Sequence, residues 1–251
     1  SFPADPIQRK AILVLNQHDV QKCLDDQKAS KSLTHDDVYV LGIPVSDKHN
    51  ISKALQNIID SHLAFPGYML IQSPYNADMY EEATQALQRF SLEKFMHFST
   101  FCQLLGAKEV NVKQIELRNR KGKTTMNFDK ETIYANSQAN KESEELEKLS
   151  SQMQLRDVFT GGDPDIESAE ILQRKYKLFN DPNMSTLLEM RSNQKNTLKS
   201  RTISLSLSSD AKKNIKIAGQ IDVPSFINLS TDYKNIESIH HEYAVTLDIS
   251  F

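Results

Sequence analysis

The chain has 251 residues, of which 39% are hydrophobic and 25% are charged, and this balance is typical of a folded globular protein rather than a disordered one. Its formal net charge of −3 argues against a general nucleic-acid or anionic-membrane binder, because such proteins usually present a net basic face. No apolar run approaches the ~20 residues that a membrane-spanning helix needs, so we expect no transmembrane segment.

The N-terminal part of the chain alternates between predicted strands and predicted helices. Residues 11–15 form a continuous apolar run, as in a strand that is buried on both faces, and residues 38–43 and 68–71 are similar. Apolar residues at helical spacing lie between them, at 20–24 and 51–63. This order predicts a βαβαβ portion with a parallel sheet.

A long helical stretch and a β-hairpin are predicted next. Residues 78–105 carry apolar side chains at helical spacing, with Ser91 as the cap between two helices and Gly106 at the end of the second. The period then changes to two, and the alternation slips by one residue near Lys113, which indicates a β-bulge. Two alternating runs joined by a glycine-containing turn predict a β-hairpin over residues 110–128.

The middle of the chain is polar and then helical. Residues 129–145 are rich in charged side chains, which is typical of a linker or of the start of a solvated helix. A helical pattern begins at residue 146, and residues 166–179 have apolar side chains spaced by three and four. Asp163 and Asp181 each precede a proline, and an N-cap followed by proline predicts the start of a helix.

The C-terminal part of the chain is predicted to be β-structure. Apolar and polar side chains alternate at residues 203–207, 215–217 and 243–251, as in antiparallel strands with one buried face. These strands either join the N-terminal strands in one mixed sheet or form a sheet of their own.

The predicted fold class is α+β, with an N-terminal βαβαβ portion, a β-hairpin, a helical segment and C-terminal antiparallel strands. The predicted division is residues 1–128, a polar linker or helix start at 129–145, and residues 146–251. The first and last parts either stand apart or form one continuous domain.

The two cysteines are too few for a disulfide scaffold. Cys23 and Cys102 each lie in an apolar helical pattern, so we expect buried, reduced thiols, as in a cytoplasmic protein. The first residues lack the charged and apolar regions of a signal peptide, which agrees with a cytoplasmic location.

Known catalytic and metal-binding patterns are missing from the sequence. None of the seven glycines forms a phosphate-binding loop, and no G-x-S-x-G motif is present. No two of the seven histidines have the i, i+4 spacing of a helical zinc site, and the adjacent His240 and His241 would point to opposite faces of a strand. We therefore expect a protein without a metal, a cofactor or catalytic activity.

The clearest charged feature is a group of four cations in the predicted hairpin turn. They are Arg118, Arg120, Lys121 and Lys123. Cations around one turn can bind an acidic protein face, and they oppose the negative charge of the whole chain. No aromatic residue lies among them to stack on bases, which argues against nucleic acid as the partner. The alternative role of a charged turn is to prevent strands from pairing edge to edge.

Polar residues after the N-terminal strands form a second candidate site. In a parallel sheet the carboxyl ends of the strands meet at one edge, where small ligands commonly bind. The residues that such a pocket would gather are Asn16, His18, Asp47, His49, Tyr75 and Asn76. Asn and Asp in such loops also cap helices, which is the alternative role for several of these side chains.

Three classes of function are consistent with these patterns. The favoured class is a protein–protein interaction or assembly module without catalytic activity, whose partner presents an acidic surface. The second class is an enzyme or small-ligand binder that uses the polar loops after the N-terminal strands. The third class is a membrane-acting protein that works through its amphipathic β-strands.

Overall fold

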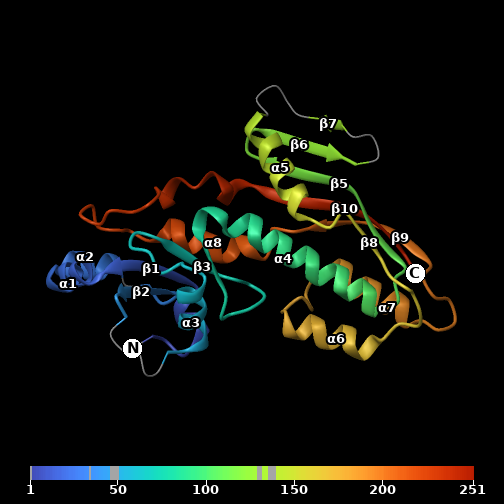
Figure 1. The fold of residues 1–251 in the computed structure, drawn as a ribbon, viewed down its shortest axis with the longest axis horizontal. Helices are drawn as coiled ribbons and strands as arrows, with labels where there is room; N and C mark the ends of the chain where they lie inside the picture. Colours follow the sequence, from blue (N-terminus) through green and yellow to red (C-terminus); the bar gives the residue numbers. More distant parts are fainter. Residues whose placement is uncertain (1, 34, 46–50, 129–131, 135–139) are drawn as a thin grey trace. The chain divides into compact units, whose positions relative to one another are not determined.

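The computed structural model describes residues 2–33, 35–45, 51–128, 132–134 and 140–251. Within these residues the fold is α+β, as the sequence predicts, with eight α-helices and two sheets (Figure 1). No helix of the described chain is both long and apolar enough to cross a membrane.

The chain divides into two compact units. The first contains residues 1–89 and 210–239, and the second contains residues 90–209 and 240–251. The division expected at residues 129–145 therefore lies inside the second unit. The predicted β-hairpin belongs with the C-terminal strands, because its first strand pairs directly with the last strand of the chain.

The first unit contains a mixed sheet of four strands. In the order in which they pair, these are β2 (Val38–Ile43), β1 (Ala11–Asn16), β3 (Met69–Gln72) and β4 (Tyr80–Glu82). Strands β1 and β2 are parallel, whereas β3 is antiparallel to both β1 and β4. The predicted parallel direction of the third strand is therefore wrong. Burial on both faces predicts that a segment is a central strand but does not determine its direction.

The link before β3 explains its reversed direction. The backbone N–H of Gly67 donates to the carbonyl of Val14 (2.8 Å), so the chain enters β3 beside the carboxyl end of β1. Gly67 has a φ of 89°, and a Cβ there would lie 2.7 Å from the carbonyl oxygen of Asn228. Glycine therefore allows the close approach of these two backbone segments.

Helices cover both faces of this sheet. The helices of the first unit are α1 (Gln17–Asp25), α2 (Gln27–Leu33), α3 (Lys53–Asp60) and α8 (Ala211–Gln220), and short 3₁₀ turns are found at η1 (Pro6–Arg9), η2 (Tyr233–Asn235) and η3 (Glu237–His240). Ile12 and Val14 of β1 belong to the same buried cluster as the apolar side chains of α3. The alternate residues Leu13 and Leu15 are equally buried, and α8 contacts β1 and β3.

Helix α8 corrects one prediction from the sequence. The alternation of Ile215 and Ile217 with polar residues predicts a strand at residues 215–217. The buried residues Ala211, Ile215 and Ala218 instead follow a helical repeat, and this longer pattern determines the structure.

The second unit begins within the 22-residue helix α4 (Ala83–Leu104). The two helices expected here are one, because Ser91 is fully buried inside the helix and does not cap a new one. Gly106 ends the helix with a φ of 81°, and the N–H of Ala107 donates to the carbonyl of Cys102 (3.0 Å). These features confirm Gly106 as the glycine that follows the helix.

The second unit contains a six-stranded antiparallel sheet. Its strands are β5 (Glu109–Asn119), β6 (Gly122–Asn127), β7 (Thr132–Tyr134), β8 (Arg156–Val158), β9 (Ser200–Ser206) and β10 (Glu242–Ser250). The pairing order is β7-β6-β5-β10-β9, and β8 pairs with the start of β5. Because no strand of the first unit joins this sheet, the alternative of a single mixed sheet is wrong for the described residues.

The sequence correctly predicts the hairpin and its irregularity. Strands β5 and β6 pair over six residues, and Figure 1 shows them side by side. Gln114 pairs with Thr246 of β10, whereas Val112 pairs with the following residue. Lys113 is therefore the extra residue of a β-bulge, as the slip in alternation indicates.

One face of the second sheet is apolar and buried, and the other is polar. Every second residue of β10, from Tyr243 to Ile249, is buried, which confirms the predicted alternation. Helix α5 (Asn140–Gln152) contacts β5 and β6, and the unit also contains α6 (Ile166–Lys175) and α7 (Pro182–Ser192), which contact each other. Asp181 caps α7 as predicted, whereas α6 is capped by Asp165 rather than Asp163.

Candidate functional site

The four cations predicted to form a binding surface come together at the end of the β5–β6 hairpin, here called the hairpin tip (residues 118–123). Arg118 and Lys123 pair across the two strands, and Asn119 pairs with Gly122. The Asn119 Oδ1 accepts hydrogen bonds from the N–H groups of Lys121 (2.9 Å) and Gly122 (3.1 Å). This side chain closes the turn and holds Arg120 and Lys121 at its outer end.

A buried carboxylate lies between two of these cations. Glu116 is two residues before Arg118 on β5 and therefore lies on the same face of the sheet. One carboxylate oxygen accepts from Arg118 Nε, and the other accepts from Lys123 Nζ (2.5 Å) and Gln114 Nε2 (3.1 Å). The Glu116 side chain is 10% exposed, whereas those of Arg118 and Lys123 are 61% and 46% exposed.

The surroundings of Glu116 favour its ionised form. Burial of the carboxyl raises its pKa, but the hydrogen bonds and charges of Lys123 and Arg118 outweigh this effect and hold the pKa below its usual value. Glu116 thus carries a negative charge at neutral pH and fixes the side chains of both neighbours. Glu116 was not predicted from the sequence as part of this site, although its spacing of two residues from Arg118 places both side chains on one face of β5.

The two outer cations differ from Arg118 and Lys123. Arg120 and Lys121 are exposed, and no carboxylate within the described residues forms an ion pair with them. The acidic side chains near the base of the tip belong to neighbouring elements: Glu142 of α5 accepts from Asn119 Nδ2 (2.9 Å), and Glu242 of β10 pairs in register with Arg118. The hairpin tip therefore has acidic groups at its base and exposed cations at its end.

A second polar region lies at the end of the sheet opposite the hairpin tip. A hollow of about 470 Å³ lies over the ends of β5, β9 and β10 and is lined by Glu109 and Asp248. Both carboxylates are already engaged, since Glu109 pairs with Arg156 (2.7 Å) and Asp248 accepts from Thr202 (2.5 Å). This end of the sheet presents compensated charges, in contrast to the hairpin tip.

The described residues of the predicted N-terminal pocket do not come together in the structure. Asn16 and His18 follow the carboxyl end of β1, whereas Tyr75 and Asn76 follow β3, which runs in the opposite direction. The two groups therefore lie at opposite ends of the strands. The distance between these ends is about 17 Å, which is the length of a six-residue strand. The remaining two residues of that prediction, Asp47 and His49, lie outside the described residues.

The individual side chains of that pocket have local roles. Asn16 Oδ1 accepts from the N–H of Asp19 (2.8 Å) and caps α1, while His18 is exposed. Tyr75 is buried, and Asn76 Oδ1 accepts from the N–H of Asp78 (3.1 Å) inside the loop after β3. The capping role that the sequence analysis gives as the alternative is thus observed for Asn16.

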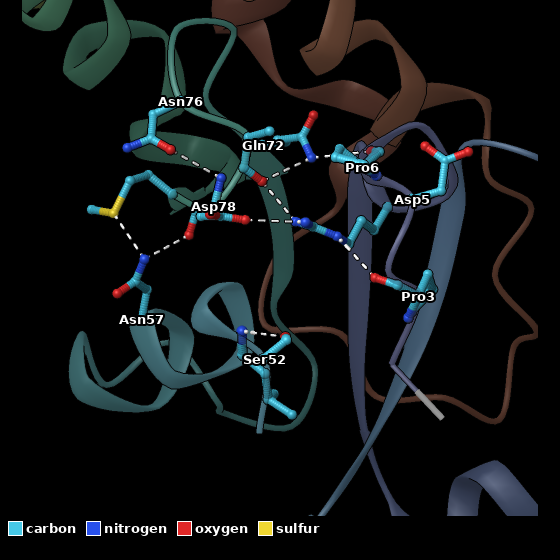
Figure 2. Close-up of polar contacts among 12 residues, drawn as sticks. Pro3, Asp5, Pro6, Ser52, Asn57, Gln72, Asn76 and Asp78 are labelled. Atoms are coloured by element: carbon cyan, nitrogen blue, oxygen red, sulfur yellow. Dashed lines mark hydrogen bonds and ion pairs between the residues drawn. The ribbon is translucent and has the colours of Figure 1, made fainter. Parts of the chain in front are cut away.

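A dense polar cluster does lie at the edge of the first sheet where β3 ends, and it was not expected from the sequence. Figure 2 shows Pro3 and Pro6 of the N-terminal segment beside Gln72 and Asp78 at the end of β3 and in the loop after it. Arg9, the last residue of η1, connects the two segments. Its guanidinium donates to the carbonyls of Pro3 (3.1 Å) and Ala77 (2.6 Å) and pairs with Asp78 (3.1 Å). Gln72 bridges the same two segments by donating to the carbonyls of Pro6 and Ala77, both at 3.1 Å.

This cluster is a structural clasp rather than a ligand site. Arg9 is 4% exposed, and its guanidinium also donates to Tyr80 Oη (2.7 Å), so most of its N–H groups are used within the protein. The Tyr80 hydroxyl in turn donates to the carbonyl of Arg9 (2.9 Å). A saturated arginine at a buried position ties the N-terminal segment to the loop and has little capacity left for a ligand.

A second buried cluster involves the adjacent histidines noted in the sequence. His241 is buried, whereas His240 is exposed. His241 Nδ1 lies 3.1 Å from Glu145 Oε2, which also accepts from Tyr243 Oη (3.1 Å). The cluster joins β10 to α5, and among the described residues no group of three potential metal ligands exists. It has the arrangement of a helix–sheet contact.

No family model, curated protein or solved structure matches this chain.

Proposed function

We propose that the protein is an interaction module without catalytic activity that binds an acidic protein surface through the hairpin tip. The observation that carries this proposal is the position of the four cations. Arg118 lies on β5, between Lys123 of β6 and Glu242 of β10, so it cannot protect a sheet edge. A charged turn that only prevents edge pairing would not need a cation there.

The edge of the sheet at β9 supports the same interpretation. Strand β9 is the last strand on its side, and its only cation is Arg201. If protection against aggregation were the main role of cations in this sheet, this edge strand should carry more of them.

Acidic protein is favoured over nucleic acid for chemical reasons. No aromatic side chain lies within the hairpin tip to stack on bases, and the chain carries a net charge of −3. Exposed cations at an interface mainly accelerate association and make binding depend on salt. These properties suit the reversible docking of a carboxylate-rich segment.

The proposal can be tested with a fluorescein-labelled peptide of alternating Asp and Glu, measured by fluorescence anisotropy. Wild type should bind it, and binding should weaken as salt is added. The double variant Arg120→Glu/Lys121→Glu should weaken binding by about tenfold or more, because it reverses two exposed charges of the surface. Circular dichroism and the melting temperature should stay close to wild type, since exposed charges contribute little to stability.

A matched control separates a local site from overall charge. Lys195→Glu/Lys199→Glu makes the same change in net charge at exposed positions elsewhere in the second unit. It should bind the peptide nearly as wild type does. Equal weakening by both double variants would contradict a site at the hairpin tip, and tighter binding of a single-stranded oligonucleotide than of the peptide would contradict an acidic protein partner.

A further inference from the structure

We infer that Glu116 is a positioning residue for the docking surface: its buried carboxylate holds Arg118 by Nε so that the outer edge of the guanidinium faces a carboxylate of the partner. This inference rests on the proposed function and names the part of the hairpin tip that recognises the partner.

The hydrogen bonds of Arg118 carry the inference. Glu116 engages only Nε, and within the described residues no bond is made to the two Nη groups. The Nη groups form the fork that binds a carboxylate through two parallel hydrogen bonds. Glu116 therefore binds Arg118 only through Nε and leaves its Nη groups available to a partner, and 61% of the Arg118 side chain is exposed.

The burial of Glu116 restricts the motion of its ion pair with Arg118. Its side chain is 10% exposed and accepts from three donors, the third being Gln114 Nε2 (3.1 Å). A long exposed arginine normally loses rotamer freedom when it binds. Here much of that loss has already occurred in the free protein, so binding should be correspondingly stronger. Lys123 is held by the same carboxylate and adds a second fixed cation.

Simple electrostatics makes the opposite prediction. Glu116 is negatively charged and close to the cations, so its removal should strengthen the attraction for an acidic partner. If Glu116 is a positioning residue, its removal should weaken binding of the acidic partner although the hairpin tip becomes more positive. The sign of the change therefore decides between the two views.

The test compares Glu116→Gln with Glu142→Gln, using the same Asp/Glu peptide and the kinetics of association and dissociation. The amide introduced by Glu116→Gln places N–H donors against at least one of Arg118 and Lys123, so one cation is released. We expect the dissociation constant to rise about tenfold, or about 1.4 kcal/mol, mainly through faster dissociation. Glu142→Gln removes the same charge beside Asn119 but leaves the carboxylate that holds both cations in place, so binding should be unchanged or slightly stronger.

A second variant covers the case in which Glu116→Gln disturbs the hairpin. Arg118→Lys keeps the positive charge but removes the fork, so the anchored geometry predicts weakening, whereas charge alone predicts no change. The Arg118 Nε–H signal in nuclear magnetic resonance spectra reports the hydrogen bond to Glu116 directly. This signal should lose its protection from exchange in Glu116→Gln. If wild type binds the peptide but Glu116→Gln and Arg118→Lys bind it equally well or more tightly, only the positioning role of Glu116 is contradicted. A wild type that fails to bind the peptide would overturn the proposed function as well.

Discussion

At the scale of single residues, three buried ionisable groups show how this chain accommodates charge in its interior. Arg9, Lys94 and Glu116 are each less than one tenth exposed, and each has charged partners. A buried charge without a partner is strongly unfavourable, so the loss of either partner should be felt in the free energy of unfolding.

Lys94 offers the sharpest test of this idea. Its Nζ lies 2.8 Å from Asp181 Oδ2, and the two side chains are 2% and 8% exposed. Asp181 also accepts from the N–H groups of Asn183 and Met184 at the start of α7. Lys94→Met should lower the free energy of unfolding by about 3–5 kcal/mol, because it leaves the aspartate buried without its cation.

The double variant Lys94→Met/Asp181→Asn provides the control for that prediction. Asparagine keeps the helix cap but carries no charge, so the double variant should recover part of the lost stability in denaturant unfolding. A double variant that is less stable than Lys94→Met alone would show that the buried charge is not the cause.

Glu145 makes the stability of the second unit depend on pH. Burial raises the pKa of its carboxyl, but the hydrogen bond and charge of His241 and the bond from Tyr243 outweigh this effect, so the pKa lies below its usual value of 4.5. A lowered folded-state pKa contributes stability above the usual pKa, and this contribution is lost as the pH falls through the lower value.

Glu145→Gln should therefore be less stable than wild type at neutral pH, by about 1–2 kcal/mol, since the carboxyl is partly exposed to water. In urea unfolding the difference should shrink as the pH falls below the usual pKa of a glutamate. Glu144→Gln, on the exposed side of α5, should show no such difference. If the difference in free energy of unfolding between wild type and Glu145→Gln stays constant as the pH falls, this would contradict an ionised carboxylate at this contact.

At the scale of elements, the end of α4 depends on a single backbone conformation. Gly106 has a φ of 81°, and a Cβ at this position would clash with the carbonyl oxygen of Gly162. Gly106→Ala should lower the free energy of unfolding by about 1–3 kcal/mol.

A second glycine provides the control for this prediction. Gly219 lies in α8, where a Cβ would meet Ile239 Cδ1 at an ordinary 3.5 Å. Gly219→Ala should therefore be neutral or slightly stabilising, by about 0.5 kcal/mol. Equal effects of the two substitutions in thermal unfolding would contradict the conformational argument for Gly106.

The elements also show what the sequence can and cannot predict. Local patterns are sufficient for the hairpin, the bulge at Lys113 and the alternating last strand, because each depends on neighbours in the chain. The predicted direction of β3 is wrong because burial on both faces does not determine strand direction, and the link through Gly67 returns the chain to the carboxyl end of β1. The strand predicted in place of helix α8 is wrong because a short alternating pair masks a longer helical repeat.

The candidate site is partly predictable for the same reason. The four cations follow one another in the chain, so their gathering at a turn needs only the hairpin register. The opposite is true of Arg9 and Asp78, which are far apart in sequence and meet only because β1 and β3 are antiparallel. Side chains that meet through sheet topology cannot be paired from one sequence.

At the scale of the whole molecule, the hairpin tip is a small positive region on a chain of net charge −3. Both cysteines are buried and free, as the sequence predicts, and are not part of this region. The hairpin tip is built on a paired and bulged sheet, which holds its cations at fixed positions. Such a local field can steer an acidic partner to one place even though the whole chain repels it weakly.

The proposed binding role of the hairpin tip can be tested directly by mapping amide chemical shifts in ¹⁵N-labelled wild-type protein titrated with the Asp/Glu peptide. We predict that the largest changes cluster on the hairpin tip and on Glu116 beneath it, and that they diminish as salt is added. If the largest changes instead fall on β9, or on the loops that flank the first sheet, the hairpin tip is not the binding surface.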